Sequence, residues 1–370
     1  MTDAAGLWRQ VFELAARGRY STSPNPRVGA LLVDDEGQVL GAGFHEKAGG
    51  PHAEIEALTA AGAAAKGATL LVNLEPCASY GRTAPCTDAL VAAGVKRVLC
   101  SIEDPDLRTA GRGVRRLLDG GVEVDVGAFA AEAERLNEAF LVSARERRPF
   151  VHLKWAASLD GRIATATGAS KWITGEAARE DAMRLREEHD AVLVGAGTIL
   201  ADDPRLTRRL GLNRSIVPHR RIVLDGALNL APERRVFDAS AGEVWLVTAR
   251  PKQDPLLAPF RDRGVRVESL PSGDDGAVDL LALLRLLHAS EVGSLCVEGG
   301  GRTAWTFLKA GLVDRVTAYV APLLIGGHSA PGPLGGSGFP TLERAARLGE
   351  VETAAVGGSV RLSARVLPPA

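Results

Sequence analysis

The sequence predicts an α/β protein with two domains, and three observations support this prediction. Short apolar strand patterns alternate with single helix patterns along the chain, which favours parallel strands covered by helices. The length of 370 residues corresponds to about two or three domains of ordinary size. The alternation is interrupted once, by a polar stretch that ends at Pro149, and it restarts at residue 150. We therefore expect one domain over 1–147 and a second over 148–370.

The first half begins with a helix and a hairpin. Apolar residues recur with a helical period over 4–18, and strand patterns follow at 28–33 and 39–44 across a short polar turn. The later elements alternate, with helices at 52–65, 85–93 and 112–118, strands at 69–74, 97–102 and 122–126, and a long charged helix at 130–146. This order predicts an antiparallel hairpin followed by parallel strands.

The second half repeats the alternation without repeating the sequence of the first half. Strands are expected at 150–156, 190–195, 221–225, 243–248, 265–269, 293–298 and 314–320, and helices at 176–188, 255–263, 278–289 and 302–310. The stretch 326–338 is rich in Gly and Pro and predicts a loop, and a last strand is expected near 360–366.

Composition excludes several classes of protein. The chain has 44 Lys and Arg against 45 Asp and Glu, with 46% hydrophobic residues, which argues against a disordered chain and against a basic nucleic-acid binder. Charged residues lie throughout the first 20 positions, and no apolar run reaches the ~20 residues of a membrane span. We expect a cytoplasmic protein with no membrane partner. Four cysteines are too few for a secreted disulfide framework.

A zinc site is predicted from three residues in the first half. His52 begins a predicted helix, Cys77 follows a strand and a proline, and Cys86 begins the next helix. One imidazole and two thiolates suit Zn²⁺, which keeps a fourth position for water in catalytic sites. Water on such an ion ionises near neutral pH, and Glu54, two residues after His52, could carry its proton. This arrangement is the signature of the zinc nucleobase deaminases, in which the Glu is not a ligand.

Taken singly, each of these residues has an ordinary structural explanation. A His beside a Glu is usually solvated surface, and Cys is among the most often buried residues. Cys100 and Cys296 lie inside apolar strand patterns, and we expect both to be core residues. The spacing between Cys77 and Cys86 is longer than the usual Cys-x-x-Cys, so a loop with Arg82 should lie beside the metal and could bind a substrate oxygen or phosphate.

At these motifs the chain resembles the deaminase half of the bifunctional riboflavin-biosynthesis deaminase-reductases. The similar segments are Ser23-Pro24-Asn25-Pro26, Val28-Gly29, Gly50-Pro51-His52-Ala53-Glu54, Leu74-Glu75-Pro76-Cys77, Gly81-Arg82-Thr83 and Pro85-Cys86. The resemblance implies His52, Cys77 and Cys86 as zinc ligands and Glu54 as the proton donor. Members often carry histidines just after the first cysteine, where this chain has Ala78, Ser79 and Tyr80.

In the second half the residue types are less decisive. Glycines at 299–301 follow a strand and precede a helix, an arrangement that exposes backbone amides to phosphate but that also makes an ordinary tight turn. The run does not match GxGxxG, so a Rossmann site is not indicated. Further polar clusters at 154–162, 170–174 and 197–204 lie near strand ends, where α/β folds bind ligands; capping and turn formation are the alternatives.

The resemblance continues through these clusters and covers nearly the whole chain. It implies a cytidine-deaminase-like first domain and a dihydrofolate-reductase-like second domain, in which NADPH reduces the ribose of a phosphoribosylamino-uracil to a ribityl chain. By position it places Ala156, Trp172, Thr198, Asp202, Gly300, Gly301, Arg302, Thr303, Ala304, Trp305 and Thr306 along the cofactor. It places Ser170, Arg186, Leu206, Arg209 and Glu298 against the substrate. Lys154 is a further polar candidate, with a solvated strand-end lysine as the alternative.

Two other functions remain open from the residues. A polynucleotide deaminase with an unrelated appended domain is disfavoured by the near-zero net charge and by the 5% of aromatic residues. A non-catalytic nucleotide-binding protein is disfavoured in the first half by the intact zinc motif. We expect small-molecule substrates and no nucleic-acid partner. The residues leave the oligomeric state open, with a homo-oligomer as one alternative.

Overall fold

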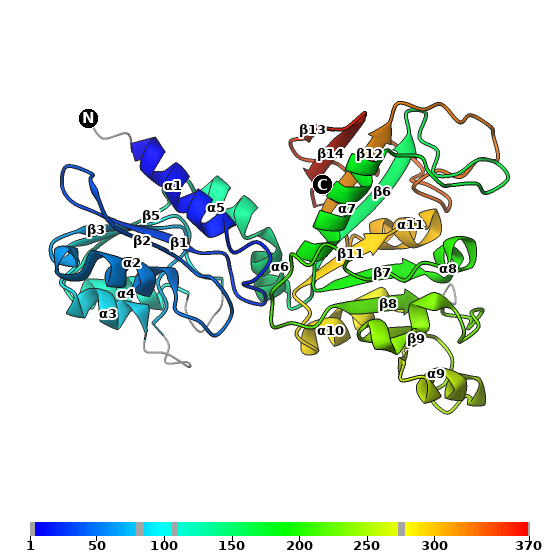
Figure 1. Ribbon diagram of the computed structural model, residues 1–370, viewed down its shortest axis with the longest axis horizontal. Coiled ribbons are helices and arrows are strands. Elements are labelled where there is room, and N and C mark those ends of the chain that lie inside the picture. Colours follow the sequence, from blue (N-terminus) through cyan, green and yellow to red (C-terminus); the bar gives the residue numbers. More distant parts are fainter. Residues whose placement is uncertain (1–3, 79–84, 106–109, 273–277, 369–370) are drawn as a thin grey trace. The chain divides into compact units, whose positions relative to one another are not determined.

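The computed structural model describes residues 4–78, 85–105, 110–272 and 278–368, and it contains two compact units. The first unit comprises Met1–Arg147 together with Asn213–Val217, and the second comprises Arg148–Leu212 and Pro218–Ala370. Each unit contains one sheet with helices packed on it, as the ribbon diagram shows (Figure 1). The α/β prediction is therefore confirmed for both halves. The assignment of the short segment Asn213–Val217 to the first unit was not predicted from the sequence.

The first unit is built on a five-stranded sheet of order β2-β1-β3-β4-β5. The strands are β1 (Gly29–Val33), β2 (Val39–Phe44), β3 (Thr69–Val72), β4 (Arg97–Cys100) and β5 (Glu123–Val126). The helices are α1 (Ala4–Ala16), α2 (Ala53–Ala61), α3 (Cys86–Ala92), α4 (Arg112–Asp119), α5 (Ala130–Leu136) and α6 (Glu138–Glu146). Strands β1 and β2 form the predicted antiparallel hairpin, and β3, β4 and β5 are parallel.

Alternating strand residues form two apolar layers on this sheet. Leu31 and Leu71 face α1, whereas Leu32 and Leu70 pack in the layer that contains α2, α3 and α4. Figure 1 shows the same division, with α1 on one side of the sheet and α2 to α4 on the other. Since α2 and α3 cover the same face, their first residues can meet at one edge of the sheet.

The second unit is built on a nine-stranded sheet of order β10-β9-β8-β7-β11-β6-β12-β14-β13. Its strands are β6 (Phe150–Ser158), β7 (Ala191–Gly195), β8 (Arg220–Leu224), β9 (Val244–Thr248), β10 (Arg266–Ser269), β11 (Ser294–Glu298), β12 (Arg315–Ala321), β13 (Glu352–Val356) and β14 (Ser359–Arg365). Its helices are α7 (Glu176–Glu188), α8 (Ala196–Asp202), α9 (Ala258–Asp262), α10 (Leu280–Ala289) and α11 (Gly301–Lys309). The strands from β10 to β12 are parallel, and β14 and β13 add an antiparallel edge.

Five details differ from the sequence prediction. The helix expected over 130–146 is broken at Asn137, whose side chain bonds both the N–H and the C=O of Arg27 at 2.8 and 3.0 Å. Helix α8 and strand β13 were not predicted. The last turn expected for α2 is a 3₁₀ helix over Gly62–Ala65, and another over Pro255–Leu257 precedes α9.

Candidate metal centre and substrate cleft

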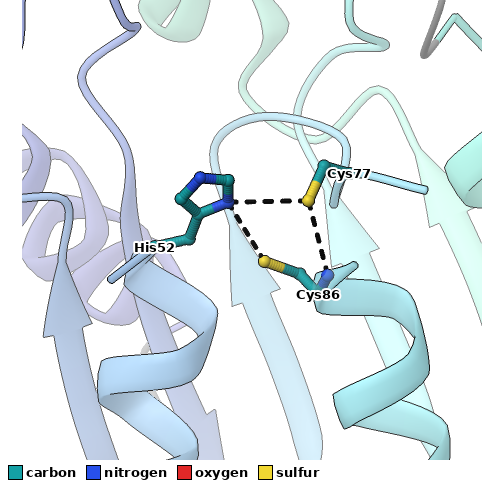
Figure 2. A group of neighbouring side chains, drawn as sticks. All are labelled: His52, Cys77 and Cys86. Carbon is teal, nitrogen blue, oxygen red and sulfur yellow. Dashed lines mark hydrogen bonds between the residues drawn. The ribbon is translucent and has the colours of Figure 1, made fainter. Parts of the chain in front are cut away.

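Three side chains of the first unit converge at the edge of the sheet. His52 immediately precedes α2, Cys86 is the first residue of α3, and Cys77 follows β3 by five residues. His52 Nδ1 lies 3.2 Å from Cys86 Sγ and 3.5 Å from Cys77 Sγ. Figure 2 shows the imidazole and the two sulfurs pointing toward one another. The structure therefore brings together the three residues that the sequence predicted as ligands.

The geometry of this group fits zinc. The three ligand atoms all lie within 4.8 Å of one another. Tetrahedral zinc with N and S bonds of roughly 2.0 to 2.3 Å holds its ligand atoms roughly 3.5 to 3.8 Å apart. The measured separations are close to that range, so an ion can be bound with little movement. Among the described residues, this is the one group of three or more such side chains placed to bind a metal ion.

A buried carboxylate holds the segment that carries Cys77. Glu75 is 3% exposed and accepts hydrogen bonds from the backbone N–H groups of Asp104, Gly111 and Val114 at 3.0 to 3.1 Å. A side chain on Gly113 would meet the carbonyl oxygen of Pro76 at 2.1 Å, so only glycine allows this close approach. Glu75 and Gly113 together fix the backbone that leads into Cys77.

The site favours a thiolate at Cys77 and contains a buried carboxyl whose pKa is raised. A hydrogen bond from Cys86 lowers the pKa of the Cys77 thiol to about 4, and the backbone N–H of Cys86 also donates to that sulfur at 3.4 Å. Glu54 lies in the first turn of α2 and is 4% exposed. Burial raises the pKa of its carboxyl above the ordinary value, and the positive charge of His52 lowers it only in part. A carboxyl with a raised pKa is suited to both accepting and donating a proton.

His45 belongs to the same environment and was not singled out from the sequence. It is 3% exposed, and its ring centre lies 5.5 Å from that of His52. Its Nδ1 donates to the carbonyl of Pro51 at 2.9 Å, so its Nε2 accepts from Asn25 Nδ2 at 3.0 Å. Burial lowers the pKa of His45, in agreement with this neutral form. No pattern in the sequence marks it, because its role depends on contacts between distant residues.

The remaining predictions for the cysteines and for the loop beside the metal can now be compared with the structure. Cys100 and Cys296 are 0% and 1% exposed, so both core assignments are confirmed. All four cysteines are free thiols. The proposed substrate contact of Arg82 lies outside the described residues.

The second unit contains a cleft of about 720 Å³. Twelve of the predicted cofactor and substrate residues line it: Lys154, Ala156, Ser170, Trp172, Arg186, Thr198, Asp202, Leu206, Arg209, Glu298, Gly300 and Ala304. They come from β6, α7, α8, β11, α11 and the loops between them. A volume of this size is typical of cofactor and substrate pockets.

A buried ion pair is the main electrostatic feature of this cleft. Arg186 donates two hydrogen bonds to the Glu298 carboxylate, at 2.7 and 2.8 Å, and Lys154 Nζ lies 3.7 Å from the same group. Burial alone would raise the pKa of Glu298, but the charges of Arg186 and Lys154 lower it to about 2. The Lys154 side chain is only 16% exposed, so it is not the solvated strand-end lysine of the alternative interpretation.

The cleft lining also contains an exposed aromatic ring and an unpaired hydroxyl. Trp172 is 69% exposed, and the Arg179 guanidinium lies 4.4 Å from its ring centre. The Ser170 hydroxyl donates to Asp202 at 3.2 Å. Thr198 Oγ1 is buried without a hydrogen-bond partner among the described residues, close to the glycines that follow β11. An unpaired buried hydroxyl in a cleft is available to a ligand.

Five predicted cofactor residues do not line the cleft: Gly301, Arg302, Thr303, Trp305 and Thr306. Trp305 packs edge-on against Phe339 with ring centres 4.9 Å apart, and Gly336 leaves room for its ring. The carbonyl of Gly301 accepts from the N–H of Gly335 at 2.8 Å. The helical period of α11 accounts for this division, since Ala304 faces the cleft and its neighbours face other elements.

No helix in the described ranges is both long and apolar enough to span a membrane.

Comparison with known proteins gives matches to both halves of the chain. Residues 149–361 match the RibD C-terminal domain, and residues 1–102 match the zinc-binding region of cytidine and deoxycytidylate deaminases. The riboflavin biosynthesis protein RibD of Escherichia coli is 43% identical over 327 residues, which cover 86% of this chain and 87% of that protein. The protein of the same name from Bacillus amyloliquefaciens is 41% identical over 95% of this chain and 93% of its own length.

Solved structures are similar over almost the whole chain. RibD of Acinetobacter baumannii superposes with a TM-score of 0.84 at 37% identity, covering 97% of this chain and 98% of that one. A diaminohydroxyphosphoribosylaminopyrimidine deaminase/5-amino-6-(5-phosphoribosylamino)uracil reductase from Thermotoga maritima gives 0.82 at 33% identity, with 98% of each chain covered. Relatives of this extent argue against an unrelated appended domain. With its zinc-binding geometry and its lined cleft, the chain belongs to the RibD family of bifunctional deaminase-reductases in riboflavin biosynthesis.

Proposed function

We propose that the two halves carry out consecutive steps on one small-molecule scaffold. Residues 1–147 carry a zinc-dependent hydrolytic deamination of a diaminopyrimidinone ribotide. Residues 148–370, with a dihydrofolate-reductase-like fold, carry the NADPH-dependent reduction of the resulting 5-amino-6-(5-phosphoribosylamino)uracil, in which ribose becomes ribityl. The observation that carries the proposal is the convergence of His52, Cys77 and Cys86 beside the buried Glu54.

For the deamination, we assign each residue of the metal centre one task. His52, Cys77 and Cys86 bind zinc, which when present lowers the pKa of water so that water can attack the carbon bearing the amine. Glu54 takes the proton from that water and gives it to the departing ammonia. Burial of the Glu54 carboxyl supports this role, because it raises the pKa of the group above its ordinary value. His45 holds the carbonyl just before His52 and so fixes the approach of that ligand.

For the reduction, the chain mainly has to align two molecules. NADPH, when bound, supplies the hydride. We propose that Trp172, Thr198 and Gly300 contact the cofactor, Thr198 through its unpaired hydroxyl and Gly300 through backbone that closely approaches a ligand. Lys154 and Glu298 contact the ribose of the substrate, and Arg209 binds its phosphate. A guanidinium suits phosphate because it can donate two parallel hydrogen bonds.

Gly301, Arg302, Thr303, Trp305 and Thr306 lie outside the lining, so we propose that this stretch acts through helix α11 and not through side-chain contact. The amides at the start of a helix favour anionic groups such as a cofactor phosphate.

We further propose a cytoplasmic location and no nucleic-acid partner. Free Cys77 and Cys86 must stay reduced to bind zinc, which a reducing compartment ensures. The oligomeric state, with a homo-oligomer as one outcome, is measured by light scattering.

One preparation tests both activities. We expect the purified chain to release ammonia from the diaminopyrimidinone ribotide only with zinc bound, and to oxidise NADPH once the deaminated product is present. Ammonia release that survives complete removal of zinc would refute the first assignment. Failure to bind NADPH at millimolar concentration would favour a protein that keeps the fold without the reduction.

A further inference from the structure

The backbone of residues 205–210 crosses the cleft lining and is held by side chains that come from other elements. The carbonyls of Arg205, Leu206 and Thr207 accept hydrogen bonds from Arg221, His219 and Arg186, at 3.3, 3.3 and 3.1 Å respectively. The N–H groups of Arg209 and Leu210 both donate to Glu187 Oε1 at 3.0 Å. This segment has no helix or strand bonds of its own, so these contacts set its path.

The path of this segment is one that the chain would not adopt unaided. Leu206 has φ of 57°, in the left-handed region that side chains other than Gly rarely occupy. Its side chain is nevertheless 4% exposed and lines the cleft. Such a conformation persists only where the surroundings over-determine it, and it is frequent at binding sites.

Among these supports, Glu187 occupies a position that is unfavourable for an acidic side chain. It is 1% exposed, and it lies in the last turn of α7, where the helix dipole disfavours a carboxylate. It does not line the cleft. A buried acidic group at a helix C-terminus requires compensation, and the two amides of the 205–210 segment provide part of it.

Glu187 holds Arg209, and Arg209 is better placed than Arg186 to bind an anion in the cleft. The fork of Arg186 is occupied by Glu298 and by the carbonyl of Thr207. The Arg209 side chain, by contrast, lines the cleft, is exposed, and makes no ion pair with any residue in the described part of the chain. Its backbone is fixed and its guanidinium is available.

We propose that Glu187 is a positioning residue of the reductase site, which acts through Arg209. By accepting the N–H groups of Arg209 and Leu210, it holds the 205–210 segment so that the Arg209 guanidinium is directed at the phosphate of the ribotide. The inference rests on the proposed reduction of a phosphorylated substrate. It adds a specificity determinant that touches neither substrate nor cofactor.

The test is a cycle of variants in the full-length protein. Glu187→Met keeps the volume and removes the acceptor, and we expect it to raise KM for the uracil ribotide by roughly 10- to 100-fold, the range of a lost charged hydrogen bond. The Kd of NADPH should stay within about twofold, the size of an ordinary surface effect. Glu187→Gln retains an acceptor oxygen and should restore most of the affinity. In an Arg209→Ala background, Glu187→Met should add little, because both changes remove the same contact.

A matched control is Glu180→Ala on the same helix, which removes an exposed carboxylate paired with Arg184 and should leave KM unchanged. If Glu187→Met does not fold, Leu210→Pro replaces it in the cycle. Proline has no backbone N–H, so this change removes one of the two donors to Glu187. Additive effects of Glu187→Met and Arg209→Ala, or an unchanged KM, would overturn the proposal. A wild-type chain that does not reduce the ribotide would instead refute the proposed function.

Discussion

The guanidinium of Arg186 and the carboxylate of Glu298 form an ion pair with two hydrogen bonds of 2.7 and 2.8 Å, although 112 positions separate them in the chain. The side chains are 14% and 11% exposed, so both charges are largely removed from water. The pKa of Glu298 is lowered to about 2, and it therefore stays ionised at neutral pH. Glu298 thus serves as an acceptor and a counter-ion in the cleft, and it does not supply a proton.

Replacement of Glu298 by Gln should destabilise the second unit. The change leaves Arg186 buried without a counter-ion, which typically costs about 3 to 5 kcal/mol. Urea unfolding followed by tryptophan fluorescence measures this, because four of the five tryptophans (Trp155, Trp172, Trp245 and Trp305) lie in that unit. A loss below about 1 kcal/mol, the value of an exposed pair, would show that the pair is hydrated.

Replacement of Glu54 by Gln should separate proton transfer from metal binding. The amide has the same shape but cannot carry the proton, so ammonia release should fall by roughly 10²- to 10⁴-fold. Zinc content should remain at one ion per chain, since Glu54 is not among the three converging ligands. Elemental analysis and an ammonia assay on the same sample check both statements. Loss of zinc together with activity would make Glu54 a ligand or a structural residue.

The second unit should lose stability in mild acid through His219. Burial and the charge of Arg208 lower the pKa of His219 from 6.5 to about 3 in the folded protein. Between these values the unfolded chain binds a proton at this ring and the folded chain does not, so the free energy of unfolding decreases as pH falls. The slope per histidine is at most about 1.4 kcal/mol per pH unit.

His152, whose pKa burial also lowers well below 6.5, adds a slope of the same sign. Urea unfolding at pH 7, 6 and 5 measures the combined effect. His219→Gln should flatten the dependence, and an unchanged slope in this variant would contradict the assignment of the effect to His219.

Replacement of Gly300 by Ala should weaken NADPH binding. Gly300 has φ of 75°, and a Cβ there would lie 3.0 Å from the unpaired Thr198 hydroxyl. Strain of this kind costs about 1 to 3 kcal/mol, which corresponds to an increase in Kd of roughly 5- to 150-fold if it opposes cofactor binding. Fluorescence titration with NADPH measures it. Gly358→Ala is the control, because its Cβ would meet nothing within 4 Å, and equal effects of the two changes would refute a local role.

Local patterns were sufficient to predict most of the fold. Strand β7 is a continuous run of apolar residues and glycine, and α7 is a helix of 13 residues rich in charged side chains. Where the prediction was wrong, a distant contact determines the structure. The break at Asn137 depends on its bonds to Arg27, which is 110 positions away in the sequence. Helix α8 contains Gly197 and Thr198, which have low helix propensity, and it is stabilised by packing of the buried Ile199.

The same distinction between local pattern and distant contact separates the site residues that were predicted from those that were not. Residues whose chemistry is specific, such as His52, Cys77 and Cys86, were identified from type and order alone. Residues whose role is to hold others, such as His45 and Glu187, were missed because the sequence does not show their partners. Glu187 does leave a weak signal, since an acidic residue in the last turn of a helix is unfavourable unless something compensates it.

The central claim is that one chain carries two separate sites, and the variant Cys86→Ser tests it most directly. Ammonia release and NADPH oxidation are measured on one preparation, the second with the deaminated ribotide supplied. We expect zinc content and ammonia release to fall to background while NADPH oxidation keeps the wild-type kcat and KM. Ammonia release at the wild-type rate without zinc, or equal loss of both activities in a folded protein, would contradict the account.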